Sequence, residues 1–185
     1  DEAGGSASLY GLSSGAVLAL EAANALPGKV KKVALYEPPV ITDSETFPPL
    51  PADYVEQQTN LVAEGRRGDA VALFMKTVGV PEEYIEPMRQ DPSWAGMESV
   101  AHTLPYDGTI LRGVTYGTPL EPNRWASATM PVAVIAGGES EPFFHDGAKT
   151  LVAQLPNAQY RTLEGQSHGV ESPALAPVLA EFFAE

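Results

Sequence analysis

Apolar runs bounded by glycine and proline divide the first part of the chain into strands and a helix. A short strand is predicted at residues 8–10, ending at Gly11, and an Ala- and Leu-rich stretch at residues 14–26 has the character of a helix. Pro27-Gly28 ends this helix, and residues 30–36 form an apolar run typical of a buried parallel strand. Two strands joined by a helix form one parallel crossover, so the pattern predicts an α/β sheet.

The pattern changes after residue 42 and returns near residue 130. Between these positions prolines separate short helical stretches, at about 54–64, 69–78 and 97–104, and no convincing strand is found. The alternating order then resumes with a strand at 131–138, a helix at 146–155, a strand at 159–163 and a helix at 174–183. We therefore expect a doubly wound, mostly parallel sheet built from residues 1–42 and 130–185, with residues 43–129 inserted as a helical cap.

Composition and charge narrow the class of protein. The 185 residues carry 24 acidic and 11 basic side chains, a net charge of −13, which argues against nucleic acid as a partner because phosphate binding needs clustered Lys and Arg. With 44% hydrophobic and 19% charged residues the chain is too apolar for intrinsic disorder. The chain is expected to form one globular domain with an insertion. The partner expected for it is a small-molecule substrate.

Several other kinds of site are excluded by the residue types present. The sequence has no cysteine, so it can form neither a disulfide nor a thiolate metal site. The acidic residues follow no metal-binding spacing, and no phosphate-binding glycine loop is found, so neither a metal ion nor a cofactor is expected. No apolar run is long enough to span a membrane, and the first residues do not form a secretion signal, so we expect a cytoplasmic protein with no membrane partner.

Gly11-Leu12-Ser13-Ser14-Gly15 matches the G-x-S-x-G motif and lies directly between the first predicted strand and the first predicted helix. A sharp turn at this point forces the serine into a strained backbone conformation, and small residues two positions before and after it avoid collisions. Ser13 is therefore the candidate nucleophile. The amide of Ser14, at the helix amino terminus, is the candidate oxyanion donor. Taken alone, the motif also fits a glycine-rich helix start without a catalytic role.

A serine nucleophile needs a base, and the chain has three histidines. His168 follows the last predicted strand, at the carboxyl end where a doubly wound sheet presents functional groups. His102 lies within the helical insertion and His145 at the start of a helix, so surface or packing roles are expected for both. His168 is the candidate general base.

The order of these elements resembles the carboxyl-terminal two-thirds of an α/β-hydrolase, and the resemblance covers nearly every residue. Tyr36-Glu37-Pro38-Pro39 and Leu163-Glu164-Gly165-Gln166-Ser167-His168 further resemble a group of uncharacterised bacterial esterase-like hydrolases. The resemblance implies a Ser-acid-His triad, an acyl-enzyme and a cap that shapes the substrate pocket. Aromatic and Met residues of the cap favour a small apolar substrate.

The acid departs from the pattern of that family. Most members carry an Asp after the strand that follows the cap, whereas Ser140 stands at about that position here, and a hydroxyl cannot stabilise an imidazolium as a carboxylate does. Glu139 or Glu141 could replace it. The alternative is Glu37, at the carboxyl tip of the second strand, a position that some lipases resembling this fold use. Glu37 is the favoured acid, against a purely structural role in pairing with a cap arginine such as Arg66 or Arg112.

The second departure concerns the start of the chain. In the family, further strands and the loop with the other oxyanion donor precede the position of Asp1, so we expect amino-terminal strands to be missing here. Three explanations stay open. The numbering could start at an internal residue, the chain could be a product of cleavage, or a partner chain or segment could supply these strands.

The sequence thus predicts a serine hydrolase that cleaves an ester, thioester or lactone through Ser13, His168 and Glu37, without a cofactor. Two alternatives stay open. The same triad could serve perhydrolysis or carbon–carbon bond hydrolysis, because fold and triad do not fix the reaction. A degenerate hydrolase fold could instead serve as a non-catalytic ligand-binding or interaction protein.

Overall fold

The computed structural model describes residues 4–42, 45 and 48–184 and divides into two compact units. The sheet unit consists of Asp1–Pro49 and Gly113–Glu185, and the helical unit consists of Leu50–Arg112. The helical unit is thus inserted between two parts of the sheet unit. It ends at Arg112, so residues 113–129, which the sequence pattern grouped with the insertion, belong to the sheet unit.

The sheet unit contains one four-stranded parallel sheet in the order β1-β2-β3-β4. Its elements along the chain are β1 (Ala7–Leu12), α1 (Ser14–Ala25), β2 (Val30–Tyr36), β3 (Val132–Gly137), α7 (Pro142–Gln154), β4 (Ala158–Leu163) and α8 (Ser172–Ala184). The predicted parallel α/β sheet is therefore confirmed, and the strand bounds differ from the expected ones by only one or two residues.

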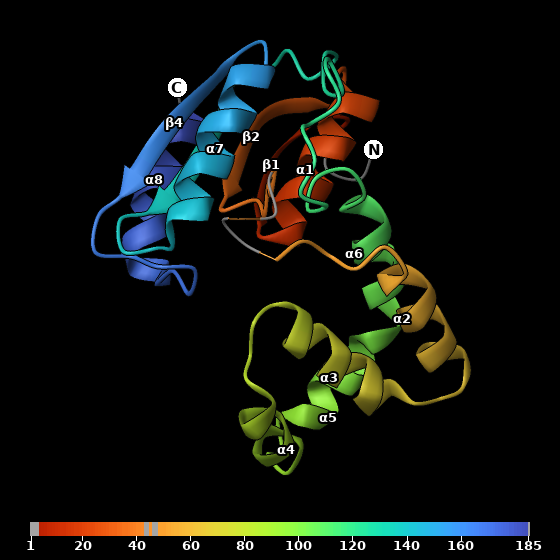
Figure 1. Ribbon diagram of the computed structural model, residues 1–185. Helices are drawn as coiled ribbons and strands as arrows, with labels where there is room; N and C mark the ends of the chain where they lie inside the picture. The colour runs from red at the N-terminus through yellow and green to blue at the C-terminus, as the bar shows by residue number, and fades with distance from the viewer. Residues whose placement is uncertain (1–3, 43–44, 46–47, 185) are drawn as a thin grey trace. The chain divides into compact units, whose positions relative to one another are not determined.

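Helices cover the sheet because its central strands are apolar on both faces. Within the sheet unit, α7 lies in front of the sheet and α8 behind it in the view of Figure 1. Alternate residues of β2 and β3 point toward α8 and form a buried cluster with it. That cluster consists of Ala34, Tyr36, Ala133, Ile135, Leu175 and Phe182.

The register of the sheet brings four chain segments to one edge. Leu12 pairs with Tyr36, Tyr36 pairs with Ile135, and Gly137 pairs with Leu163. Because all four strands are parallel, the residues that follow these positions lie at the same carboxyl edge. They are Ser13, Glu37, the turn after Gly137 and the loop after Leu163.

The helical unit has a core of its own. It contains α2 (Tyr54–Ala63), α3 (Arg67–Thr77), α4 (Glu82–Arg89), α5 (Trp94–Val100), the 3₁₀ helix η1 (Ala101–Thr103) and α6 (Leu104–Ile110). Its buried cluster comprises Ala70, Val71, Ile85, Trp94 and Ala101, against which Met75, Met88 and Met97 pack. Trp94 and these three methionines therefore contribute to the core of this unit, the packing role expected for most apolar residues of the insertion.

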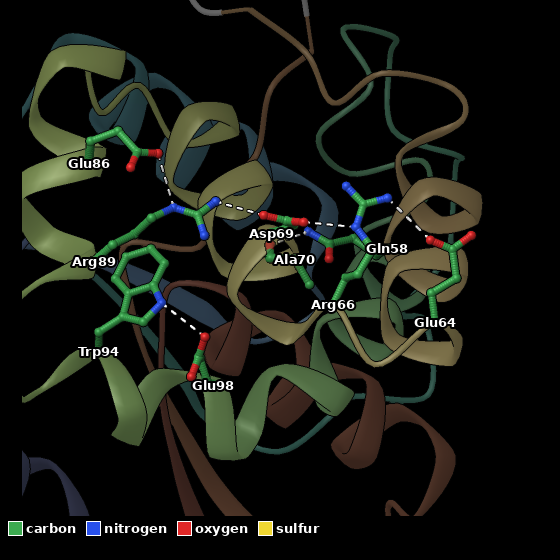
Figure 2. A network of polar contacts seen from close by, with 9 residues as sticks. All are labelled: Gln58, Glu64, Arg66, Asp69, Ala70, Glu86, Arg89, Trp94 and Glu98. Atoms are coloured by element: carbon green, nitrogen blue, oxygen red, sulfur yellow. Dashed lines mark hydrogen bonds and ion pairs between the residues drawn. The ribbon is translucent and has the colours of Figure 1, made fainter.

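A network of charged side chains joins α3 to α4 at the surface of the helical unit (Figure 2). The carboxylate of Asp69 accepts hydrogen bonds from Arg66 Nε at 2.8 Å and from Arg89 Nη2 at 2.9 Å. Hydrogen bonds from Arg89 and Arg66 hold the pKa of the Asp69 carboxyl below its ordinary value. The network borders an open pocket of about 510 Å³, and its paired charges link two helices that are separate in sequence.

Prolines account for some of the differences between the predicted and observed helices. Between residues 42 and 130 the sequence pattern treats them as separators, yet Pro105 lies in the first turn of α6 and Pro87 lies inside α4. Pro142 begins α7, four residues before the predicted start at 146. In a first turn proline costs no intrahelical hydrogen bond, because that N–H has no helical acceptor.

None of the helices in the described residues is long and apolar enough to cross a membrane.

Candidate active site

Ser13 forms the turn between β1 and α1 and has a strained backbone. Its φ and ψ angles are 55° and −125°, a region that a non-glycine residue occupies only at a cost of about 1–3 kcal/mol. Two hydrogen bonds hold this conformation: Ser13 N donates to Tyr36 O, and Ala16 N donates to Ser13 O, each at 2.9 Å. Ser13 is also the residue before the helix, but its side chain makes no capping hydrogen bond. Its hydroxyl is therefore not used to terminate the helix.

The two glycines of the motif have different steric environments. A Cβ atom on Gly11 would overlap the backbone carbonyl of Gly15, so the close approach of strand and helix requires glycine at position 11. At Gly15 an added Cβ would meet no heavy atom of the described structure within 4 Å, apart from its chain neighbours and the backbone of its own helix. The expected need for a small residue is thus a property of Gly11, and the expectation of a collision at Gly15 is wrong.

Ser14 is the first residue of α1. The first amides of a helix have no intrahelical acceptor, and the helix dipole places partial positive charge at that end. The Ser14 N–H adjoins Ser13 and is therefore available to a negative oxygen.

Glu37 is the first residue after β2, and it is fully buried, with 0% of its surface exposed. Its φ of 47° is again in the left-handed region, and its N–H donates to Ile135 O at 2.9 Å. One carboxylate oxygen, Oε2, lies 2.7 Å from His168 Nδ1. The other, Oε1, accepts a hydrogen bond from Gly137 N at 2.7 Å and a short one from Ser140 Oγ.

These donors keep the buried carboxyl group ionised. Burial raises the pKa of Glu37, but hydrogen bonds from His168, Ser140 and Gly137 outweigh burial and bring this pKa below the ordinary value of 4.5. Each partner of Glu37 belongs to the sheet unit.

The imidazole of His168 is held on several sides. The ring of Phe144, from α7, stacks on it with centroids 4.6 Å apart and planes 14° from parallel. The hydroxyl of Tyr36 donates to Ser167 O at 2.8 Å and so fixes the preceding residue. With Nδ1 engaged by Glu37, Nε2 is the ring nitrogen that can exchange a proton, and 42% of the His168 side chain is exposed.

The structure brings some of the sequence candidates together and separates others. Glu37 contacts His168, and both lie at the sheet edge that carries Ser13 and Ser14. In the described residues the Ser13 hydroxyl makes no hydrogen bond to His168. The side chains of Glu139 and Glu141 are exposed and make no hydrogen bond to His168 within the described chain.

The other two histidines have separate environments. His102 Nδ1 lies 3.2 Å from Ser99 O in the helical unit, and His145 Nδ1 lies 2.7 Å from the Tyr160 hydroxyl. Among the described residues no group of three His, Asp or Glu side chains could hold a metal ion.

The sequence pattern assigns no role to Tyr36, Gly137 or Phe144, although each contacts Glu37, His168 or the residue before His168. Gly137 ends a strand that is recognisable from its apolar run, but nothing in the sequence shows where its N–H points. In the sequence pattern Ser140 stands where a carboxylate is expected, and in the structure its hydroxyl donates to Glu37.

The steric difference between the two glycines gives a stability prediction. Gly11→Ala should lower the free energy of unfolding by about 1–3 kcal/mol, because strand and helix must move apart. Gly15→Ala should be neutral or stabilising by up to about 1 kcal/mol, since alanine favours the helix and has space there. Urea unfolding of both variants measures the difference, and equal effects would contradict the steric argument.

The lowered pKa of Glu37 gives a prediction for acid stability. Because its pKa is lower in the folded than in the unfolded protein, the unfolded state binds more protons between the two values. The stabilisation is complete above about pH 4.5 and is lost as the pH falls through the lower, folded-state value. Glu37→Gln should therefore lose less stability than the unmodified protein between pH 6 and pH 3 in urea unfolding. Parallel curves would show that the folded environment does not favour the carboxylate.

Known proteins that resemble this chain in sequence or structure are alpha/beta hydrolases. The family model described as the alpha/beta hydrolase family matches residues 1–180. An alpha/beta hydrolase from Sphaerobacter thermophilus is 46% identical, with a TM-score of 0.81 over 99% of this chain and 69% of its own length. No curated protein matches the chain.

More distant structures share the fold. A thermophilic esterase from Thermogutta terrifontis has 17% identity and a TM-score of 0.60, over 99% of this chain and 66% of its own. The enol-lactonase from Burkholderia xenovorans has 20% identity and a TM-score of 0.56, over 98% of this chain and 66% of its own. The chain thus spans about two thirds of the length of these proteins. With a family match over nearly all its residues and a relative of 46% identity, the chain belongs to the alpha/beta hydrolase family.

Proposed function

We propose that this protein is a serine hydrolase that cleaves a carboxylic ester, thioester or lactone, with Ser13 as nucleophile, His168 as general base and Glu37 as the acid that orients His168. The observation that carries the proposal is the hydrogen bond of 2.7 Å between His168 Nδ1 and the buried Glu37 carboxylate. Fixing this nitrogen determines the tautomer and leaves Nε2 for proton transfer.

In the proposed reaction, Ser13 Oγ attacks the substrate carbonyl carbon while its proton passes to His168 Nε2. The carbonyl oxygen becomes an oxyanion, stabilised by the Ser14 N–H at the amino terminus of α1. Collapse of the tetrahedral intermediate breaks the bond to the alcohol or thiol, which takes the proton from His168. Water then attacks the acyl-enzyme and loses a proton to His168. His168 passes this proton to Ser13 Oγ as the acyl–Oγ bond breaks, so the carboxylic acid leaves and the Ser13 hydroxyl is restored. Glu37 stays ionised and pairs with the transient imidazolium.

The substrate is proposed to be small and apolar. Support comes from the aromatic and Met content of the helical unit, but Trp94 and Met97 are part of that unit's own core. A series of p-nitrophenyl esters from acetate to octanoate tests this point, since an apolar acyl pocket should raise kcat/KM with chain length.

Labelling with a fluorophosphonate probe tests the nucleophile. The probe should form a Ser13 Oγ–phosphorus bond with loss of fluoride, and the adduct should be found on the peptide containing Ser13. Ser13→Ala should abolish labelling, and His168→Ala should slow it strongly because the hydroxyl loses its base. Labelling that persists in Ser13→Ala would contradict the assignment.

Hydrolysis of p-nitrophenyl acetate tests the acid. Glu37→Gln should lower kcat by roughly 10³–10⁴-fold, as expected for loss of the carboxylate behind a catalytic histidine. Glu139→Gln is the matched control and should leave kcat unchanged, because the Glu139 side chain is exposed. The reverse result would assign the acid to the turn after β3.

The two alternative functions give different results in these assays. Ser13-dependent labelling without hydrolysis of any ester would favour perhydrolysis or carbon–carbon bond hydrolysis by the same triad. Absence of both labelling and hydrolysis would favour a non-catalytic binding protein.

A further inference from the structure

We infer that Ser140 is a positioning residue, whose hydroxyl binds the Glu37 carboxylate and holds it in the orientation that His168 requires. Its expected effect on turnover rests on the proposed function, whereas its effect on Glu37 can be measured without turnover. The residue sits in the turn between β3 and α7 and is partly exposed.

The donors around Glu37 are divided between its two oxygens. Oε1 accepts from the Gly137 N–H and the Ser140 hydroxyl, and Oε2 is paired with His168 Nδ1. A carboxylate can only accept hydrogen bonds, so the Ser140 hydroxyl is necessarily the donor. With two donors on Oε1, rotation of the carboxylate would break both bonds, and Oε2 stays directed at His168.

Backbone contacts fix the turn that carries Ser140. Ser140 N donates to Gly137 O at 3.2 Å, and Glu139 N donates to Gln166 O at 2.9 Å. A Cβ atom on Gly137 would meet the Gln166 carbonyl and lie 2.8 Å from Ser140 Oγ, so only glycine permits this close approach. The turn is thus tied to the loop before His168, and the hydroxyl is held in place before any substrate binds.

A neutral donor suits this position electrostatically. The groups that face Glu37 are His168, the Ser140 hydroxyl, the Gly137 N–H and the neighbouring Tyr36 phenol. Burial, together with the charge of Glu37, raises the pKa of Tyr36, which stays uncharged. Ser140 therefore stabilises the carboxylate without a second cation that would compete with the imidazolium for it.

Acid unfolding gives a test that does not depend on activity. In Ser140→Ala, Glu37 loses one donor, so its pKa should be lowered less and the stability lost between pH 6 and pH 3 should be smaller. The Ser140→Ala curve should lie between those of the unmodified protein and Glu37→Gln. Ser140→Thr, which keeps the hydroxyl, should follow the unmodified protein. Coincidence of the Ser140→Ala curve with that of the unmodified protein would overturn the inference.

Kinetics provide the second readout. Ser140→Ala should lower kcat/KM by about 10-fold, the size expected for loss of a hydrogen bond to a charged group. This loss should grow as the pH falls towards 4.5, because Glu37 is protonated more readily in Ser140→Ala. Ser140→Thr should restore both, and Glu139→Ala, an exposed neighbour in the same turn, should change neither. A loss of activity in Ser140→Ala that Ser140→Thr does not restore would mean that the hydroxyl is not the cause.

The two readouts separate this inference from the proposed function. If Ser13→Ala retains hydrolysis, the proposed function fails, while the acid-unfolding comparison still decides whether Ser140 stabilises the Glu37 carboxylate. If Ser13→Ala is inactive but Ser140→Ala matches the unmodified protein in both assays, only the inference about Ser140 fails.

Discussion

A carboxylate without any exposed surface is the constraint on which this structure depends. Burying an ionised group is unfavourable unless donors replace the lost water, and Glu37 obtains three donors from two separate segments, the turn at Gly137–Ser140 and the loop that carries His168. Both segments must therefore lie close to the carboxyl end of β2, where Glu37 is. The burial of Glu37 thus brings the turn after β3 and the loop after β4 together at the candidate site.

The same backbone arrangement occurs at Ser13 and at Glu37, each at the carboxyl end of a strand. Ser13 and Glu37 each follow a strand, each have a positive φ, and each donate a backbone hydrogen bond to the next strand. The bond from Ser13 reaches Tyr36, and the bond from Glu37 reaches Ile135. Neighbouring strands thus hold the strained residues in place, so the chemical groups are carried by rigid structure rather than by free loops.

Much of this architecture could be predicted from sequence, because the features concerned are local. The apolar runs of β2 and β3, the Gly11–Gly15 motif and the position of His168 after a strand led to the correct fold and to a candidate triad whose roles stay a prediction. The sequence pattern does not predict α4, because Pro87 lies inside it and packing overrides the local preference of proline. It also places the start of α7 four residues late, although proline suits the first turn of a helix. The roles of Tyr36 and Phe144 depend on contacts across more than 20 residues of sequence, which a single sequence does not reveal.

The two chain segments that connect the sheet unit to the helical unit have a consequence for how far the length of the helical unit can vary. Ile41 N donates to Val114 O at 2.8 Å and Gly117 N donates to Ile41 O at 3.0 Å, so the chain leaves and re-enters the sheet unit at one clamped point. An insertion anchored in this way can be lengthened, shortened or exchanged at little entropic cost to the sheet. The clamp thus uncouples the length of the helical unit from the geometry of the strand ends that carry Ser13 and Glu37.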